Sequence, residues 1–277
     1  MNNILKSIVL GYFELIKKRL RKVRDEKSYR LYPNNPKHND IYLVEFPKSG
    51  VTWLATLIAN INLLESNEKV QATFYNLHQY IPDIHKSRDL IDKPLWNFPK
   101  YRFIKSHDTY NKNYNFVIYL IRDPYKVMNS YYIFCKQLGW YDKTFKEFVE
   151  DPVFGIKSWV HHTNSWLDRK VSAQRIHFLK YEDLIDDPFL TINNLYTNLG
   201  LLVDDKNINK AISLSNIENM KKTEKFYNIN SSASTEFEFV DKSKNFFEEN
   251  MNEDIKSYIY DNVKNSKIYN KYYEKLI

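Results

Sequence analysis

The sequence predicts an α/β protein in which a central, mainly parallel sheet lies between two layers of helices. Four short runs rich in β-branched and aromatic residues lack regular polar alternation, which is typical of buried parallel strands. These runs are IYLVEF (41–46), YRFIKS (101–106), NFVIYLIR (115–122) and RIHFLKYE (175–182). Segments with a helical apolar period separate them, and this alternation of strands and helices indicates a three-layer sandwich.

Two kinds of pattern define the helices between the strands. Apolar side chains recur with helical spacing after the first and third strands, at Trp53, Leu57, Ile61 and Leu64 and at Val127, Tyr131, Phe134 and Leu138. Gly139 follows the second of these stripes as a C-cap. Asp187 and Pro188 form an N-cap and N1 pair that starts another helix, which we expect to end at Gly200.

Charge and composition divide the chain into three segments. The net charge is +7, and residues 1–30 alone hold nine Lys/Arg against three Asp/Glu, so the rest is close to neutral. We therefore expect no nucleic-acid partner. Residues 1–30 are predicted to form a basic amphipathic helix, residues 31–40 a linker and residues 41–277 a single domain.

The basic helix has two interpretations. Only ten residues separate Lys6 from Lys17, about 15 Å of helix, which is too short to cross a bilayer. One interpretation is contact of residues 1–27 with an anionic membrane surface. We favour packing on the domain or on a second copy, and the oligomeric state stays open. Cys135 is the single cysteine, which favours a reducing, cytoplasmic location.

The segment FPKSGVTWLA (46–55) follows the first strand and predicts an anion site. It is not a nucleotide P-loop, because Lys48 precedes Gly50 and no earlier glycine is present. The free N–H groups of a helix that starts near Val51 would still attract an anion. The side chains that would assist are the Lys48 ammonium, the Ser49 and Thr52 hydroxyls and the Trp53 ring, on which a purine could stack.

Polar side chains also follow two further strands. His107 comes after the second strand and Arg122 after the third, and ligands of such sheets bind beyond the carboxyl ends of the strands. His107 suits a general base, and the alternative is a polar residue satisfied at a strand end. Arg122 suits a phosphate, and the alternative is an ion pair with Asp123 or Glu182.

Four segments together resemble the cytosolic sulfotransferases, which use 3′-phosphoadenosine 5′-phosphosulfate (PAPS) and release 3′-phosphoadenosine 5′-phosphate (PAP). PKSGVTW (47–53) is similar to the family's P-K-S-G-T-T-W loop. The other three are FIKSHDT (103–109), LIRDPYKVMNSYYIF (120–134) and FLKYEDLIDDP (178–188), and NIENMKK (216–222) is a fainter match. The resemblance covers about two thirds of the chain and implies a divergent member with the P-loop NTPase-like sulfotransferase fold.

The resemblance implies a role for each matched residue in an in-line sulfuryl transfer that requires no metal. His107 would be the base, Lys48 and Lys105 would stabilise charge on the transferring group, and Arg122 with Ser130 would bind the 3′-phosphate. Trp53 and Tyr181 would contact adenine, or alternatively pack in the core. The implied nucleotide-binding set is Lys48, Ser49, Gly50, Val51, Thr52, Trp53, Arg122, Ser130, Tyr181, Ser215 and Ile217.

The chain departs from the family near its C-terminus. The family's R-K-G-x-x-G-x-W-K segment, which closes the 3′-phosphate site, has no counterpart, since the last glycine is Gly200. Lys242 or Lys244 is a candidate replacement. Val51 stands where the family has threonine, and Ile217 where an aromatic residue often flanks the adenine.

The acceptor is expected to be a small molecule with a hydroxyl or amine. The loops at 72–100, 139–154 and 226–247 would form an aromatic pocket with Phe74, Tyr75, Tyr80, Trp96, Trp140, Tyr141 and Phe145. Two other functions stay open at this point, a non-catalytic nucleotide-binding relative and a small-molecule kinase. The identity of the acceptor is not determined by these residues.

Overall fold

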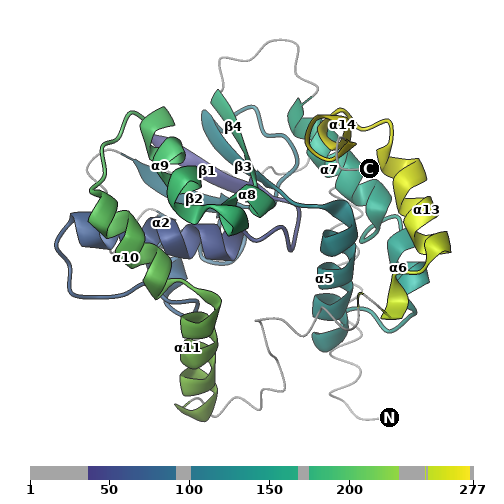
Figure 1. Cartoon of the computed structure of the whole chain (residues 1–277), viewed down its shortest axis with the longest axis horizontal. Coiled ribbons are helices and arrows are strands. Elements are labelled where there is room, and N and C mark those ends of the chain that lie inside the picture. Colours follow the sequence, from purple (N-terminus) through teal and green to yellow (C-terminus); the bar gives the residue numbers. More distant parts are fainter. Residues whose placement is uncertain (1–36, 92–100, 168–174, 231–246, 248, 275–277) are drawn as a thin grey trace.

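The computed structural model describes residues 37–91, 101–167, 175–230, 247 and 249–274. Within these residues, four parallel strands form one sheet in the order β2-β1-β3-β4. The strands are β1 (Asp40–Glu45), β2 (Arg102–Ser106), β3 (Phe116–Ile121) and β4 (Arg175–Lys180). Figure 1 shows the sheet between two groups of helices.

The side chains of β1 alternate between two hydrophobic clusters, one on each face of the sheet. Tyr42 and Val44 pack with α5 (Pro124–Gln137), α6 (Phe145–Glu150), α7 (Ile156–Leu167), α13 (Glu253–Val263) and α14 (Lys267–Tyr272). Ile41 and Leu43 pack with α2 (Val51–Glu65), α3 (Leu77–Tyr80), α8 (Tyr181–Asp186), α9 (Pro188–Asn198) and α10 (Asp205–Leu214). This arrangement confirms the predicted three-layer α/β sandwich with a parallel sheet.

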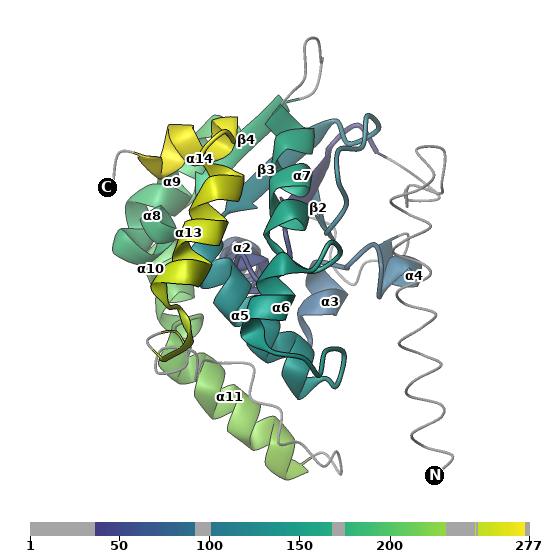
Figure 2. The same cartoon turned by 90° about the vertical axis from the view of Figure 1, so that its right-hand side faces the viewer.

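Two further helices belong to the described residues, and Ile91 in the first of them is buried in the same cluster as Tyr42 and Val44. The short α4 (Arg88–Ile91) precedes β2 in the chain, and α11 (Ile217–Asn230) follows α10. In both views α11 extends away from the sheet (Figures 1 and 2). None of the described helices combines the length and apolar character that crossing a bilayer requires.

The helix boundaries follow the predicted caps. Asp187 is the N-cap of α9 and accepts the Leu190 N–H at 2.9 Å, with Pro188 at N1. Gly139 and Gly200 follow α5 and α9 with φ of +66° each, the left-handed conformation that ends a helix. These three predictions are confirmed.

Two predicted boundaries are corrected by the structure. The strand predicted at 175–182 ends at Lys180, because Tyr181 already begins α8, where Glu182 and Asp183 occupy the first turn and favour a helix N-terminus. Asp40 belongs to β1 rather than to the linker, and its carboxylate pairs with the Arg102 guanidinium at 2.7 Å. The basic helix predicted at 1–30 lies outside the described residues, and the division into segments stays a prediction.

Candidate active site

The carboxyl ends of all four strands meet at one edge of the sheet. Because the strands are parallel, the residues that follow them converge there: the loop containing Lys48 after β1, His107 after β2, Arg122 after β3 and Tyr181 after β4. The structure therefore brings together the four chain segments on which the predicted site depends.

The loop after β1 folds into a tight turn and delivers the start of α2 to this edge. The N–H and hydroxyl of Ser49 both donate to the Phe46 carbonyl, at 3.2 and 2.9 Å. Lys48 has φ +73° and Gly50 φ +105°, and α2 begins at Val51 as expected. In this conformation the Ser49 hydroxyl is buried within the loop, so its role as a donor to an anion stays a prediction.

Gly50 is required by the close approach of Tyr181. A Cβ atom at Gly50 would lie 2.4 Å from two carbons of the Tyr181 ring. The positive φ of Gly50 is also unfavourable for any residue with a Cβ. The ring of Tyr181 thus closes directly on the backbone of the loop.

Lys48 is half-buried in the loop after β1. Its ammonium lies 4.6 Å from the centre of the Phe134 ring on α5, a cation–π contact. Burial lowers the pKa of Lys48 to about 8, although the nearby Glu45 carboxylate opposes the shift; Arg122 and Lys105 lower it further. Positive charge is therefore concentrated where an anion is expected.

Arg122 is held by the loop and by Tyr181. Its Nη1 donates to the Lys48 carbonyl at 3.1 Å, and its Cζ lies 4.5 Å from the centre of the Tyr181 ring. The Nε atom is buried without a hydrogen-bond partner among the described residues, and such an orphaned donor fits a site for a bound anion.

The alternative role for Arg122, an ion pair with Asp123 or Glu182, is not formed in the part of the chain that the structure describes. Asp123 instead caps α5 by accepting the Tyr125 N–H at 2.8 Å. Glu182 accepts the Asp123 N–H and the Tyr273 hydroxyl, each at 3.1 Å. Both carboxylates are thus used to fix backbone and helix positions.

His107 lies beside the end of β1. Its Nδ1 is 3.4 Å from the Glu45 carbonyl and 3.8 Å from the Glu45 carboxylate. Burial holds the pKa of His107 well below its usual range, and the Lys105 charge and then His85 lower it further. The imidazole is therefore neutral near pH 7, which is the form that can accept a proton.

A buried hydrogen-bond network fixes the backbone on either side of His107. The Tyr114 hydroxyl donates to Asp108 at 2.8 Å, and the Ser106 hydroxyl contacts both partners. The His107 carbonyl lies 3.2 Å from His162 Nε2, which must carry the proton because a carbonyl only accepts. His162 Nδ1 then accepts from the Tyr119 hydroxyl at 2.8 Å.

Lys105 points to the same edge from β2. Its ammonium lies 3.7 Å from the Asp83 carboxylate. The backbone around Asp83 runs alongside β2, since the Lys105 N–H donates to the Pro82 carbonyl at 2.9 Å and the Ile84 N–H donates to the Lys105 carbonyl at 3.0 Å. The segment around Asp83 therefore holds both the backbone and the ammonium of Lys105 in place.

Three residues of the predicted nucleotide-binding set come together although they are far apart in the chain. The Trp53 indole donates to the Ser215 carbonyl at 2.9 Å and packs edge-on against the Tyr181 ring, with 5.9 Å between ring centroids. Ile217 begins α11 and is 52% exposed, so its side chain is available at the rim. Ser130 lies on α5 and is half-buried, while Thr52 lies half-buried in the first turn of α2.

The aromatic residues predicted for the acceptor pocket have different positions. Tyr141 and Phe145 are buried in the core against Phe148 and Tyr132, so the prediction that they line a pocket is wrong. Trp140 packs edge-on against Phe134, the ring beneath Lys48, and thus lies near the site. The described residues also include the half-buried Phe74, Tyr75 and Tyr80, whereas Trp96, Lys242 and Lys244 lie outside them.

Sequence reasoning missed three residues that touch the predicted site: Glu45, Asp83 and His162. The signal for Glu45 was present, because it is a carboxylate that interrupts an apolar strand immediately before the loop. Asp83 and His162 lie in segments that reach the site only through the fold.

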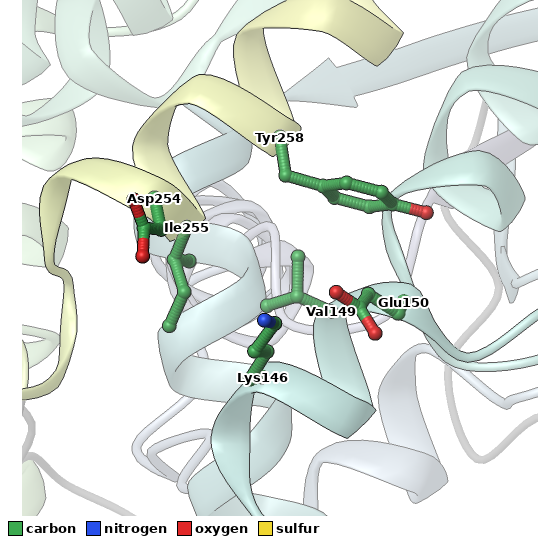
Figure 3. Close-up of a pocket in the computed structure, with 6 residues that line it drawn as sticks. All are labelled: Lys146, Val149, Glu150, Asp254, Ile255 and Tyr258. Carbon is green, nitrogen blue, oxygen red and sulfur yellow. The ribbon is translucent and has the colours of Figure 1, made fainter.

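A small surface pocket lies apart from these residues, between α6 and α13 (Figure 3). It is lined by Lys146, Val149, Glu150, Asp254, Ile255 and Tyr258. None of the six residues belongs to the predicted site or follows a strand of the sheet. Within the described part of the chain, no group of histidine, cysteine or acidic side chains is arranged to hold a metal ion.

The comparison with protein families decides the family of this chain. The family model described as the sulfotransferase domain matches residues 38–275. The chain belongs to the sulfotransferase family. The match covers every segment on which the resemblance was based, and the predicted family is therefore confirmed. The protein is an enzyme of the sulfotransferase class.

Individual sulfotransferases show how far this chain has diverged. Sulfotransferase 1E1 of Bos taurus is 27% identical over 228 residues, which cover 76% of this chain and 74% of the bovine one. Retinol dehydratase in a complex with retinol and PAP superposes with a TM-score of 0.65 over 89% of this chain and 87% of that chain, at 17% identity. Mouse sulfotransferase SULT7A1 complexed with PAP superposes with a TM-score of 0.57 over 84% of this chain and 88% of that chain, at 20% identity. The structural likenesses confirm the predicted fold.

Proposed function

We propose that this sulfotransferase transfers a sulfuryl group from PAPS to a hydroxyl or amine of a small-molecule acceptor, with His107 as general base. The observation that carries the proposal is the position of the His107 imidazole, directly after β2 and 3.4 Å from the Glu45 carbonyl that precedes the predicted anion loop. PAP in the solved complexes of two structural neighbours supports the choice of donor.

The proposed step is an in-line displacement at sulfur. The acceptor oxygen or nitrogen forms a bond to sulfur while the bond from sulfur to the phosphate oxygen breaks, and PAP leaves. His107 takes the acceptor proton on Nε2. Lys48 and Lys105 stabilise the negative charge on the leaving phosphate and on the sulfuryl oxygens, as preorganised cations do in related group transfers.

The nucleotide would lie across the carboxyl edge of the sheet. The first turn of α2 would face the 5′-phosphosulfate, although its Val51 N–H donates to Glu45. Arg122 and Ser130 would face the 3′-phosphate, and Trp53 and Tyr181 the adenine. The buried, unpartnered Nε of Arg122 supports a second anion position next to the loop. The aromatic residues near the site support an apolar or planar acceptor.

The donor is tested by ligand-induced stabilisation. PAP at 100 times its Kd should add about 2.7 kcal/mol to the free energy of unfolding, which appears as a clear rise in Tm. Lys48→Ala should abolish the rise, and Lys210→Ala, at an exposed position on α10, should keep it. Absence of the rise in the wild type, or a larger one with ATP and Mg²⁺, would count against PAPS and favour the kinase alternative.

The base is tested separately by turnover with PAPS and a panel of phenols, alcohols and amines. His107→Asn should lower the rate by at least about 100-fold while the PAP-induced rise in Tm stays. PAP binding by the wild type without turnover of any acceptor would favour the non-catalytic alternative.

A further inference from the structure

Glu45 is a buried carboxylate at the centre of the site. It is the last residue of β1, it is 4% exposed, and the four residues before it in the strand are the apolar Ile-Tyr-Leu-Val. Its Oε2 accepts the Val51 N–H, the first of α2, at 2.7 Å, and its Oε1 lies 3.8 Å from His107 Nδ1. One carboxylate thus contacts both the anion loop and the imidazole.

We propose that Glu45 is a positioning residue for His107, which holds the imidazole with its proton on Nδ1 and stabilises the imidazolium formed when Nε2 accepts a proton. This inference rests on the proposed function, in which His107 is the base. Carboxylates that fix the tautomer and orientation of a catalytic imidazole recur in enzymes of unrelated folds.

The tautomer follows from what Nδ1 faces. The carbonyl of Glu45, at 3.4 Å, and its carboxylate, at 3.8 Å, can only accept hydrogen bonds when the carboxylate is ionised. Nδ1 is therefore the protonated nitrogen, and the lone pair remains on Nε2, where the acceptor proton would arrive.

Electrostatics give Glu45 its second role. Burial is the main cause that disfavours a charged His107, Lys105, His85 and His162 add to it, and the hydrogen bond to the Glu45 carbonyl opposes it. The neighbouring Asp108 is turned away, since its carboxylate accepts from Tyr114 at 2.8 Å and lies 3.5 Å from His85. Among the described residues, Glu45 is the carboxylate that forms an ion-pair contact with the His107 ring.

The charges around Glu45 favour its ionised form, but burial outweighs them and the pKa of Glu45 is raised. Burial raises the pKa of Glu45, and Lys105, the Val51 N–H, Lys48 and Arg122 all oppose that rise. These groups belong to β2, α2, the loop and the end of β3, so cations surround the carboxylate on several sides. A neutral side chain in its place would remove the carboxylate that forms an ion-pair contact with the His107 ring.

The first test observes the imidazole directly and does not depend on turnover. Nitrogen-15 NMR of histidine-labelled protein, with the His107 signal assigned by His107→Asn, should show His107 predominantly as the Nδ1–H tautomer at pH 7. In Glu45→Gln the amide can still accept from Val51 but can also donate to Nδ1. The ratio of the Nε2–H to the Nδ1–H tautomer should therefore rise about tenfold, the change that one pKa unit represents.

The second test uses rate. Glu45→Gln should lower kcat by at least about tenfold and move the acid limb of the kcat/KM profile to lower pH by about one unit, because a charge that favours the imidazolium is lost. Glu45→Asp should restore part of kcat. The PAP-induced rise in Tm should persist in both variants, which separates positioning from donor binding.

The outcomes separate the two proposals. An Nε2–H tautomer in the wild type would overturn the role of Glu45, even if Glu45→Gln failed to fold. So would a pH profile and a tautomer ratio that are unchanged in Glu45→Gln. A wild type without sulfuryl transfer but with a tautomer that depends on Glu45 would overturn the base role of His107 and leave the contact between the two residues established.

Discussion

The guanidinium of Arg122 lies against the ring of Tyr181, with its Cζ 4.5 Å from the ring centre. Neighbouring parallel strands produce this contact, because Arg122 directly follows β3 and Tyr181 directly follows β4. The same ring also packs directly against Gly50, in the loop between β1 and α2. Tyr181 thus fixes both the anion loop and the arginine that is proposed to bind the 3′-phosphate.

Replacement of Arg122 by lysine is expected to weaken the binding of PAP more than the binding of a nucleotide that lacks the 3′-phosphate. Lysine keeps the charge but loses the planar fork and the stack on Tyr181, and the lost charge-assisted hydrogen bonds correspond to about 1.5–3 kcal/mol, or roughly 10- to 150-fold in Kd. Calorimetric titration measures this. Arg175→Lys, at the exposed start of β4, is the matched control. An equal loss for AMP, which lacks the 3′-phosphate, would place Arg122 elsewhere on the nucleotide.

Replacement of Gly50 by alanine should destabilise the protein more than the same change at Gly139. Both glycines have a positive φ, which costs an alanine about 1–2 kcal/mol. Only Gly50 adds a clash, since the Tyr181 ring would lie 2.4 Å from the new Cβ, whereas nothing lies within 4 Å at Gly139. Urea unfolding gives both free energies. Equal values would show that the Tyr181 ring moves aside at no cost.

The affinity for PAP is expected to fall as pH rises through 8. The pKa of Lys48 is lowered to about 8, so the side chain is charged below that pH and loses its proton above it. The attraction of Lys48 for the anion is therefore present at pH 7. Above pH 8 the affinity for PAP should fall by up to about tenfold for each pH unit. Lys48→Arg keeps its charge throughout and should show a flat profile between pH 7 and 9.5. Parallel profiles for the two proteins would assign the dependence to another group.

Removal of the Tyr114 hydroxyl should lower both stability and kcat, although Tyr114 is not part of the proposed site. Tyr114→Phe leaves the Asp108 carboxylate without its donor at 2.8 Å, a loss of about 1–3 kcal/mol in unfolding free energy. The Phe ring retains the stack on Tyr42. Because Asp108 adjoins His107, we expect kcat to fall as well.

The matched control for Tyr114 is Tyr101→Phe. The Tyr101 hydroxyl donates to the Leu199 carbonyl at 3.0 Å, so the control also removes one hydrogen bond, but from α9 and not from the segment around His107. It should lower stability by a similar or smaller amount and leave kcat unchanged. If both variants lowered kcat equally, the effect would be one of general stability.

The layers, the parallel direction of the strands and the loop could be anticipated because each depends on local patterns. Buried strands lack alternation, Asp187-Pro188 caps a helix, and Gly50 precedes one. The boundary at Tyr181 could not be read in this way, since the aromatic Tyr181 resembles a continuation of β4, although it already begins α8. Tyr141 and Phe145 resemble pocket residues in sequence, and only the packing of α5 against α6 shows them to be core.

The contacts that adjust the site were the least predictable part. His162 and Asp83 act from segments that lie far from the loop in sequence, and their partners are a backbone carbonyl and a lysine on β2. Such contacts depend on distances of a few ångströms between separate elements, which no periodicity encodes. Glu45 was visible as a charged residue in an apolar strand, but the orientation of its carboxylate toward both Val51 and His107 required the fold.

β4 passes into α8 without an intervening residue, since Lys180 ends the strand and Tyr181 begins the helix. A helix advances by about 100° per residue, so inserting a single residue at this junction would rotate the tyrosine away from both Gly50 and Arg122. Residues 66–71 between α2 and α3, by contrast, are all exposed and could change in number without such a rotation. The number of residues can therefore vary in surface connections of this enzyme, whereas the number of residues at the junction between β4 and α8 is fixed by the contacts of Tyr181.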